Sequence, residues 1–190
     1  MSESSLCRLS HRLSVCGGVV WCAMSIDFFV GIDPGQYGAV AVLSAGGDLL
    51  SLVDMPGISA EPMAADVAAL LEAVGRVDQV MVGIEEPFAV SQNSSASSLT
   101  QGQAHGILLG VIGTLHLRHE RIKPVDWKRE LKLPMGKGLT AAVKKRNSRE
   151  HASRLWPASA DLWAKASQDG RAEAALIGEC LRRRMVMRTL

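Results

Sequence analysis

The chain has 190 residues, which is enough for one domain of ordinary size, and its apolar content of 47% supports a buried core. Its formal net charge of +2 hides an uneven distribution, because residues 1–117 hold three Lys or Arg against eleven Asp or Glu, whereas residues 118–190 hold eighteen against eight. This segregation suggests a basic surface that faces a polyanion beside an acidic cluster able to hold divalent cations, although solvated helix faces would produce the same counts.

Residues 1–23 do not share the strand periodicity that follows, and Met24 stands just before the first predicted strand. We interpret them as a disordered leader or an upstream-start extension, so that one domain covers residues 24–190. The alternative is a targeting peptide, because Arg8, Arg12 and several serines precede a modest apolar run. That run is too short to span a bilayer and no other segment approaches the necessary length, so no membrane partner is expected.

The four cysteines show neither CxxC pairing nor histidine partners at zinc-ligand spacing. This argues against a zinc site and against a disulfide framework. A reducing, intracellular setting is therefore expected.

The first half of the domain is predicted to begin with three strands, near residues 27–33, 38–44 and 48–54, joined by short glycine-rich turns. Such closely spaced strands are typical of an antiparallel meander. Residues 63–75 then place apolar side chains at helical spacing before a fourth strand near 79–85, which predicts a crossover to a parallel strand.

The second half alternates helices with a final strand. A polar, serine-rich stretch precedes an apolar helix at about 100–117, and RIKPVDW, residues 121–127, is predicted as a fifth short strand. A loop around 133–138, a basic helix through 140–155 and a helix that begins near Asp169 complete the chain. The order of elements predicts an α/β fold with a mixed five-stranded sheet, three antiparallel strands followed by parallel ones, and helices on both faces.

Four acidic residues stand where these elements would bring them together. Asp33 and Glu85 end two strands that can lie side by side, and ligands of open α/β sheets gather at the carboxyl ends of strands. Asp169 and Glu173 are four residues apart and share one face of the last helix. Glu86 competes with Glu85, but strand alternation places it on the opposite face.

Clustered carboxylates repel one another and take up protons unless cations neutralise them. Mg²⁺ suits such a site because it prefers carboxylate oxygens and accepts phosphate oxygens as further ligands. Two such ions could activate a water and stabilise the leaving oxygen in an attack on a phosphodiester. Taken singly, three of the four acids have a structural alternative: Asp33 as a turn residue, Asp169 as a favourable charge at a helix N-terminus, and Glu173 as a solvated side chain. Glu85 alone is a weaker signal than Asp33.

The segments that carry these acids, GIDPG, GIEEP and DGRAEAALI, resemble those of RuvC-type Holliday junction resolvases, in the phage and organellar branch of the ribonuclease-H-like superfamily. Further similar segments are QGQAHGILLGVIGTL, KPVDWKRELKL and KRNSREHASRLWP, so that the resemblance covers residues 28–180. Bacterial RuvC spaces its last two acids as Asp-x-x-Asp, whereas here they run Asp-x-x-x-Glu, which leaves Asp169 as the least secure match.

The resemblance implies a homodimer that binds a four-way DNA junction and makes paired, symmetric nicks with two Mg²⁺ ions, for which Mn²⁺ can substitute. By position, Asp33, Glu85, Asp169 and Glu173 would be the catalytic metal ligands. The expected location is the cytoplasm of a bacterial or phage-infected cell, with organellar targeting by residues 1–23 as the alternative. The apolar helix at 100–117 is the expected dimer contact.

The basic residues near these acids are candidates for DNA binding. Lys145 matches the family's Lys-x-x-Ser position, so a phosphate contact close to the cut is expected for it. The others, for which a solvated helix charge is the alternative reading, are Lys128, Lys137, Lys144, Arg146 and Arg149. Trp127 and Trp156 are expected to be packing residues rather than stacking platforms.

Three other functions were weighed against the resolvase. The first is a branched-DNA-binding protein that kept the fold and lost cleavage, which the four intact acids argue against. The second is a ribonuclease-H-like nuclease for other branched or hybrid substrates. The third is a kinase of the actin-like ATPase group, which would need two copies of the fold, whereas 190 residues hold only one.

Overall fold

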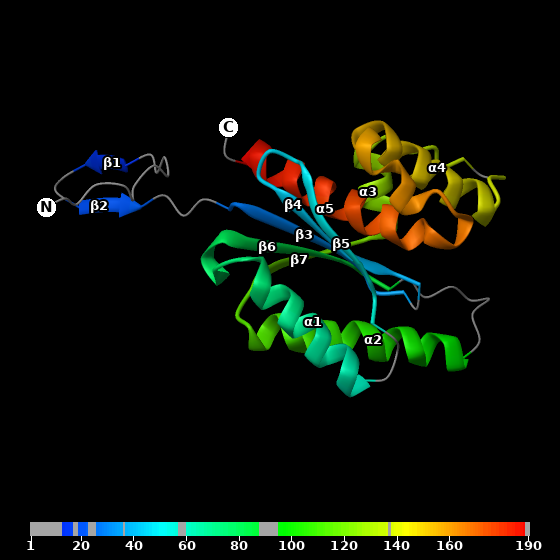
Figure 1. Cartoon of the computed structure of the whole chain (residues 1–190), viewed down its shortest axis with the longest axis horizontal. Coiled ribbons are helices and arrows are strands. Elements are labelled where there is room, and N and C mark those ends of the chain that lie inside the picture. Colours follow the sequence, from blue (N-terminus) through cyan, green and yellow to red (C-terminus); the bar gives the residue numbers. More distant parts are fainter. Residues whose placement is uncertain are drawn as a thin grey trace, which may run out of the picture.

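The protein folds around a five-stranded sheet of order β5-β4-β3-β6-β7, with helices α1 and α2 on one face and α3, α4 and α5 on the other (Figure 1). This confirms the predicted fold class. The computed structural model describes residues 13–16, 19–22, 26–35, 37–56, 60–87, 95–136 and 138–188.

The first three strands of the sheet form the predicted antiparallel meander. They are β3 (Phe28–Asp33), β4 (Ala39–Ser44) and β5 (Leu49–Asp54), and β4 pairs with both of the others. β3 and β4 are buried on both faces, as expected from their near-continuous apolar runs, whereas the edge strand β5 is largely exposed.

The crossover to a parallel strand is also confirmed. Helix α1 (Ala60–Val74) and the short 3₁₀ helix η1 (Val77–Gln79) lead to β6 (Val80–Glu85), which pairs in parallel with β3. Ile32 lies opposite Ile84 in this register. The residues that follow them, Asp33 and Glu85, therefore end neighbouring strands at the same edge of the sheet.

The fifth strand was predicted in the wrong place. β7 is Arg118–Ile122, parallel to β6, and residues Pro124–Glu130 form helix α3 instead of continuing the strand. Proline at the first position of a helix lacks only an N–H that the helix would leave unpaired there, and its fixed φ suits the helix. The Lys-Pro junction therefore marks a helix start, and Trp127 lies on a helix.

The remaining helices lie close to their predicted positions. α2 (Ser95–Thr114) begins five residues before the prediction and ends three before it, and His116 follows with a φ of 53°. α4 (Ala141–Leu155) begins after Thr140, whose hydroxyl accepts a hydrogen bond from the Val143 N–H. Two 3₁₀ helices, η2 (Pro157–Trp163) and η3 (Ala166–Gln168), lead into α5 (Asp169–Arg188).

Each face of the sheet has its own core. Under α1 and α2 lie aliphatic and methionine side chains such as Ile84, Leu108 and Met63. The other core includes three tryptophans, Trp127, Trp156 and Trp163. Trp127 is fully buried and Trp156 is 8% exposed, which confirms that both are packing residues.

Helix α5 approaches strand β3 more closely than side chains would permit. A Cβ added at Gly31 would lie 2.0 Å from the Ala174 carbonyl oxygen and 2.4 Å from the Gly178 backbone nitrogen. At the start of α5, a Cβ added at Gly170 would lie 2.1 Å from the Tyr37 carbonyl oxygen. Glycine at these positions lets the backbones touch, which fixes the height of α5 above the sheet.

The N-terminal region contains a separate hairpin, in which β1 (Leu13–Cys16) pairs with β2 (Val19–Cys22). Neither strand joins the five-stranded sheet. The boundary of the domain at Met24 stays a prediction. Across the described ranges, none of the helices has the length and apolar character needed to cross a bilayer.

We expect a chain that starts at Met24 to fold and melt like the full chain, because the five-stranded sheet takes no strand from residues 1–23. Thermal unfolding of the two chains, followed by circular dichroism, checks this. A shortened chain that is insoluble, or that melts much earlier, would make the N-terminal segment part of the domain.

Gly31→Ala should destabilise the fold by about 1–3 kcal/mol, because the new methyl group meets backbone atoms of α5 that cannot rotate away. Gly46→Ala is the matched control, since its nearest contact would be 3.4 Å from the Ser44 hydroxyl. Urea unfolding measures both variants. Equal stabilities would show that α5 is not held at this height by the glycine.

Candidate active site

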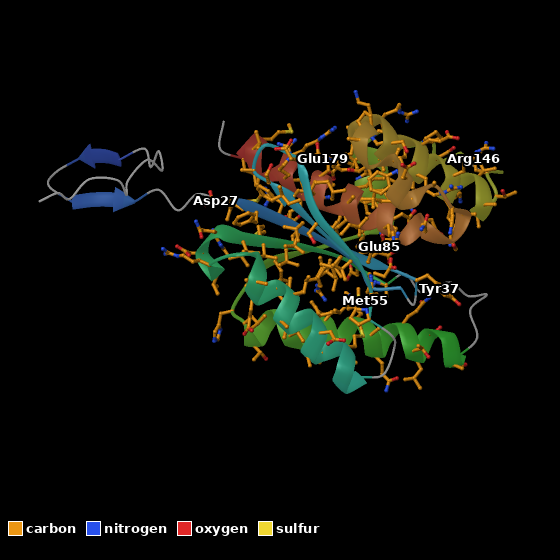
Figure 2. All side chains as sticks on the ribbon, viewed as in Figure 1. Asp27, Tyr37, Met55, Glu85, Arg146 and Glu179 are labelled. Atoms are coloured by element: carbon orange, nitrogen blue, oxygen red, sulfur yellow. The ribbon has the colours of Figure 1, made fainter. Side chains whose placement is uncertain are left out.

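The two strand acids lie together at the carboxyl edge of the sheet. Glu85 is at the same end of the sheet as Tyr37 and Met55, while Glu179 lies toward the other end (Figure 2). Asp33 turns the chain after β3 and accepts a hydrogen bond from the Gly35 N–H at 3.0 Å. Its carboxyl group is thereby held beside the end of β6.

Helix α5 brings the two remaining acids to the same place. Asp169 is its first residue and is 8% exposed, and Glu173 follows one turn later with a side chain that is 13% exposed. Because the glycine contacts seat this end of α5 on the β3–β4 turn, both carboxylates lie close enough to Asp33 to raise its pKa. The structure therefore brings together all four acids predicted from the sequence.

Each helix acid is paired with a lysine from a different helix. The Lys145 ammonium lies 2.7 Å from Asp169 Oδ2, and the Lys128 ammonium lies 3.2 Å from Glu173 Oε1. The Lys128 ammonium also stands 4.7 Å from the centre of the Trp127 ring, a cation–π distance. The lysines supply positive charge where the carboxylates are most crowded.

Two neutral donors orient the carboxylates further. The Trp127 indole N–H donates to Glu85 Oε2 at 2.8 Å, and the Ser148 hydroxyl donates to Glu173 Oε1 at 2.9 Å. Both donors are fully buried, so neither can exchange its partner for water without a local rearrangement. These contacts fix the direction of two of the four carboxylates.

The pKa values reflect this crowding. Burial raises the pKa of Asp33 well above its ordinary range, and the charges of Glu173 and Asp169 raise it further, against the lowering effect of the Gly35 N–H and Lys128. Burial also raises the pKa of Glu85, with Asp33 and Glu173 adding to the shift. The positive groups of the protein therefore do not fully offset the negative charge of these carboxylates.

The donor chemistry fits Mg²⁺ or Mn²⁺, because four carboxylates within electrostatic reach of one another are hard oxygen ligands. In the part of the chain that the structure describes, no group of three or more His, Cys, Asp or Glu side chains is arranged to hold a metal ion. One oxygen of Asp169 and one of Glu173 pair with lysines, and one oxygen of Glu85 accepts from Trp127. A metal ion bound here would compete with the two lysines for Asp169 and Glu173.

Three other basic residues predicted to bind DNA lie on α4. Lys144 and Arg146 are exposed, and Arg146 pairs with Glu150 at 3.5 Å, a weak contact on the surface. Arg149 is tethered, because its guanidinium donates to the Ala164 carbonyl at 2.9 Å. Lys137 lies outside the described residues.

Glu86 is separated from this cluster. Its backbone N–H donates to the Ile122 carbonyl, and its carboxylate acts on His105 of α2, on the opposite face of the sheet. The predicted alternation at the end of β6 therefore describes the geometry correctly.

Sequence reasoning missed the contacts of Trp127, Ser148 and Lys128 with the acids. Trp127 was expected only to pack, and Lys128 only to bind DNA. For Ser148 a signal existed, because it follows Lys145 by three residues and so shares its helical face. The contacts of Trp127 with Glu85 and of Lys128 with Glu173 join α3 to β6 and α5, and no local sequence pattern predicts them.

The fold is that of RuvC. Two structures of Thermus thermophilus RuvC, one of them in complex with a Holliday junction substrate, superpose on this chain with TM-scores of 0.56 and 0.54. The sequence identities are 19% and 21%, and each match covers 83% of this chain and 96% of the RuvC chain. No protein-family model matches the sequence, and no curated protein is significantly similar to it.

In the absence of metal, Asp33→Asn should leave the protein equally stable or more stable. The pKa of Asp33 is raised in the folded state, so the folded state binds the proton more tightly than the unfolded state. Wild-type stability must therefore fall as the pH rises above the ordinary Asp range, and Asp33→Asn removes the part of this fall that Asp33 causes, while Glu85 keeps its own part. Unfolding in urea and EDTA between pH 4 and pH 8 measures the difference, which should exceed about 1 kcal/mol at the upper end.

Asp66→Asn, an exposed position on α1, is the control and should follow the wild type at every pH. Added Mg²⁺ or Mn²⁺ should raise the wild-type melting temperature by linkage and should raise that of Asp33→Asn less. A parallel pH dependence of wild type and Asp33→Asn would contradict the raised pKa of Asp33, which burial and then the neighbouring acids cause.

Proposed function

We propose that this protein is a metal-dependent endonuclease that resolves four-way DNA junctions by paired, symmetric nicks. The observation that carries the proposal is the meeting of four carboxylates from β3, β6 and α5 directly below the basic helix α4, which touches them through Lys145. The fold shared with RuvC supports it, since one of the matching structures is a complex with a Holliday junction substrate.

The residues that would hold the two divalent ions are Asp33, Glu85, Asp169 and Glu173. When bound, such ions would lower the pKa of a water and offset the negative charge of the phosphate. The buried donors Trp127 and Ser148 hold Glu85 and Glu173 in one orientation as the strand binds.

The lysines that now pair with the acids have a second role on substrate binding. Lys145 is 56% exposed along its side chain, so it can turn from Asp169 to a phosphate oxygen at little cost. Lys128 is more enclosed, at 22%, and stays close to the site over the Trp127 ring. Movement of Lys145 onto a phosphate would free an oxygen of Asp169 as the strand binds.

Two nicks related by symmetry require two active sites held at a fixed separation, which we infer to be provided by a homodimer. Helix α2 supports this inference. None of its twenty residues is Asp, Glu, Lys or Arg, and its exposed face carries Gly102, Gly106, Gly110 and Gly113, around which a Cβ would meet nothing within 4 Å. A long uncharged helix with an open glycine face suits close packing against a second copy.

A non-catalytic junction-binding protein is the second candidate, and the lysine–carboxylate pairs favour it. If the two lysines stay on Asp169 and Glu173 when DNA binds, each occupies a carboxylate oxygen for which a metal ion would have to compete. A nicking assay separates the two candidates, because only the nuclease cuts a labelled four-way junction when Mg²⁺ is added.

Glu85→Gln should reduce nicking of a mobile four-way junction by at least about 100-fold, because it removes charge from the metal ligands. Glu86→Gln should stay within about twofold of wild type, since Glu86 lies on the other face of the sheet. Both variants should bind the junction, because the basic surface is unchanged. An essential Glu86 and a silent Glu85 would place the site on the α2 side of the sheet.

Gly106→Glu should yield a monomer that binds DNA and does not make paired nicks, because a charged side chain is placed in the middle of the α2 face. Light scattering measures the mass, and cutting of a supercoiled cruciform distinguishes single from paired nicks. Met187→Glu, at an exposed position near the end of α5, is the control. A wild-type protein that is monomeric while cutting fully would rule out the dimer.

A further inference from the structure

A small apolar pocket adjoins the acidic site through Lys128, and its apolar lining takes no part in the proposed cutting of DNA. It lies between α3, the loop that follows it and α4, and its volume is about 240 Å³. Two of its apolar side chains are unusually open to solvent, Val125 at 47% and Met135 at 43%. The other apolar residues of its lining are Pro124, Leu133 and Pro134.

Two lysines complete the lining, and they tie the pocket to the acids. Lys128 lines the pocket and also forms the ion pair with Glu173. Lys144 lines it as well, and its neighbour Lys145 forms the ion pair with Asp169. A strand whose phosphate lies over the acids would therefore run close to the mouth of this pocket, because Lys128 belongs to both.

The chemistry of the pocket suits one base of such a strand. Apolar side chains, methionine and proline among them, are used by DNA-bending proteins to contact the faces of unstacked bases. The lysines offer charge to the phosphates on either side of that base. The volume is smaller than the roughly 300–1,000 Å³ of pockets for drug-sized ligands, which suits a single ring system rather than a whole nucleotide.

We propose that this pocket receives an unstacked base of the DNA strand next to the cleaved phosphate, and that its apolar lining, Met135 in particular, sets the sequence preference of cutting. The inference rests on the proposed function and deepens it. Extruding a base costs least where pairing is already interrupted, as it is at the centre of a four-way junction. Bases that differ in shape would fill the pocket unequally, and the strand would be cut faster where the fit is better.

The test uses junctions that carry 2-aminopurine at single positions around the cut, because this base becomes brighter when it leaves the stack. The binding partner is the full chain with Asp33→Asn, in Mg²⁺, so that the junction is held and not cut. One position should brighten on binding. Met135→Ala in the same background should lose most of that signal, Met135→Leu should keep it because the apolar volume is retained, and Met187→Ala should keep it because that exposed methionine lies far along α5.

In the nuclease with Asp33 intact, Met135→Ala should reduce the ratio of cutting rates between preferred and poor sequences by about fivefold or more. Total junction affinity should stay within about twofold of wild type. The variant is expected to fold, since Met135 is substantially exposed.

Three results would overturn the proposal. If the increase in 2-aminopurine fluorescence and the sequence preference of cutting are the same for Met135→Ala as for wild type, the pocket holds no base. The proposed function would still stand. If Met135→Ala instead loses dimer mass while the fluorescence is unaltered, the pocket belongs to the contact between two copies. If the wild-type protein neither binds nor cuts any branched DNA, the proposed function fails and the pocket proposal fails with it.

Discussion

The contact between α5 and β3 is the constraint on which the rest of the structure depends. Gly31 on the strand and Gly178 on the helix leave no side chain between the two backbones. Without this approach, α5 would stand farther from the sheet, and Asp169 and Glu173 would not reach the carboxyl ends of β3 and β6. Gly170 likewise lets the backbone of α5 pack directly against the backbone of Tyr37, at the end of the helix that carries the acids. Packing between two glycine surfaces thus decides the geometry of a charged site.

The acidic and basic halves of the chain both contribute side chains to the site. The acidic half of the chain contributes Asp33 and Glu85 on buried strands, and burial raises the pKa of both. The basic half contributes the two helix acids together with the lysines that compensate them. The packing of the two cores offsets the repulsion among the four acids, and Lys128 and Lys145 reduce that repulsion in part. A divalent cation would relieve it more completely, because it brings twice the charge of an ammonium group to the same oxygens.

Much of this was predictable from local patterns. Strand endings at Asp33 and Glu85 follow from apolar runs that stop at an acid, and the shared face of Asp169 and Glu173 follows from helical spacing. The fifth strand was misplaced because RIKPVDW was interpreted as one strand across Pro124, although proline there starts a helix. The contacts of Trp127 with Glu85 and of Lys128 with Glu173 join residues more than forty positions apart, and only the tertiary fold determines them. The close approach of α5 to Gly31 could not be predicted from the sequence either, because a glycine in a strand does not indicate which element packs against it.

The central claim is that the four acids form a site for divalent cations, and the indole N–H signals of the tryptophans test it most directly. Trp127 donates to Glu85 within the site, whereas Trp156 donates to the Gly47 carbonyl in the β4–β5 turn, at the other end of the sheet. Titration with Mn²⁺, which broadens nearby resonances, should remove the Trp127 indole signal from the nitrogen–proton spectrum at low metal concentrations and leave that of Trp156 sharp. Equal broadening of both signals, or a Trp127 signal that persists at millimolar Mn²⁺, would contradict the account.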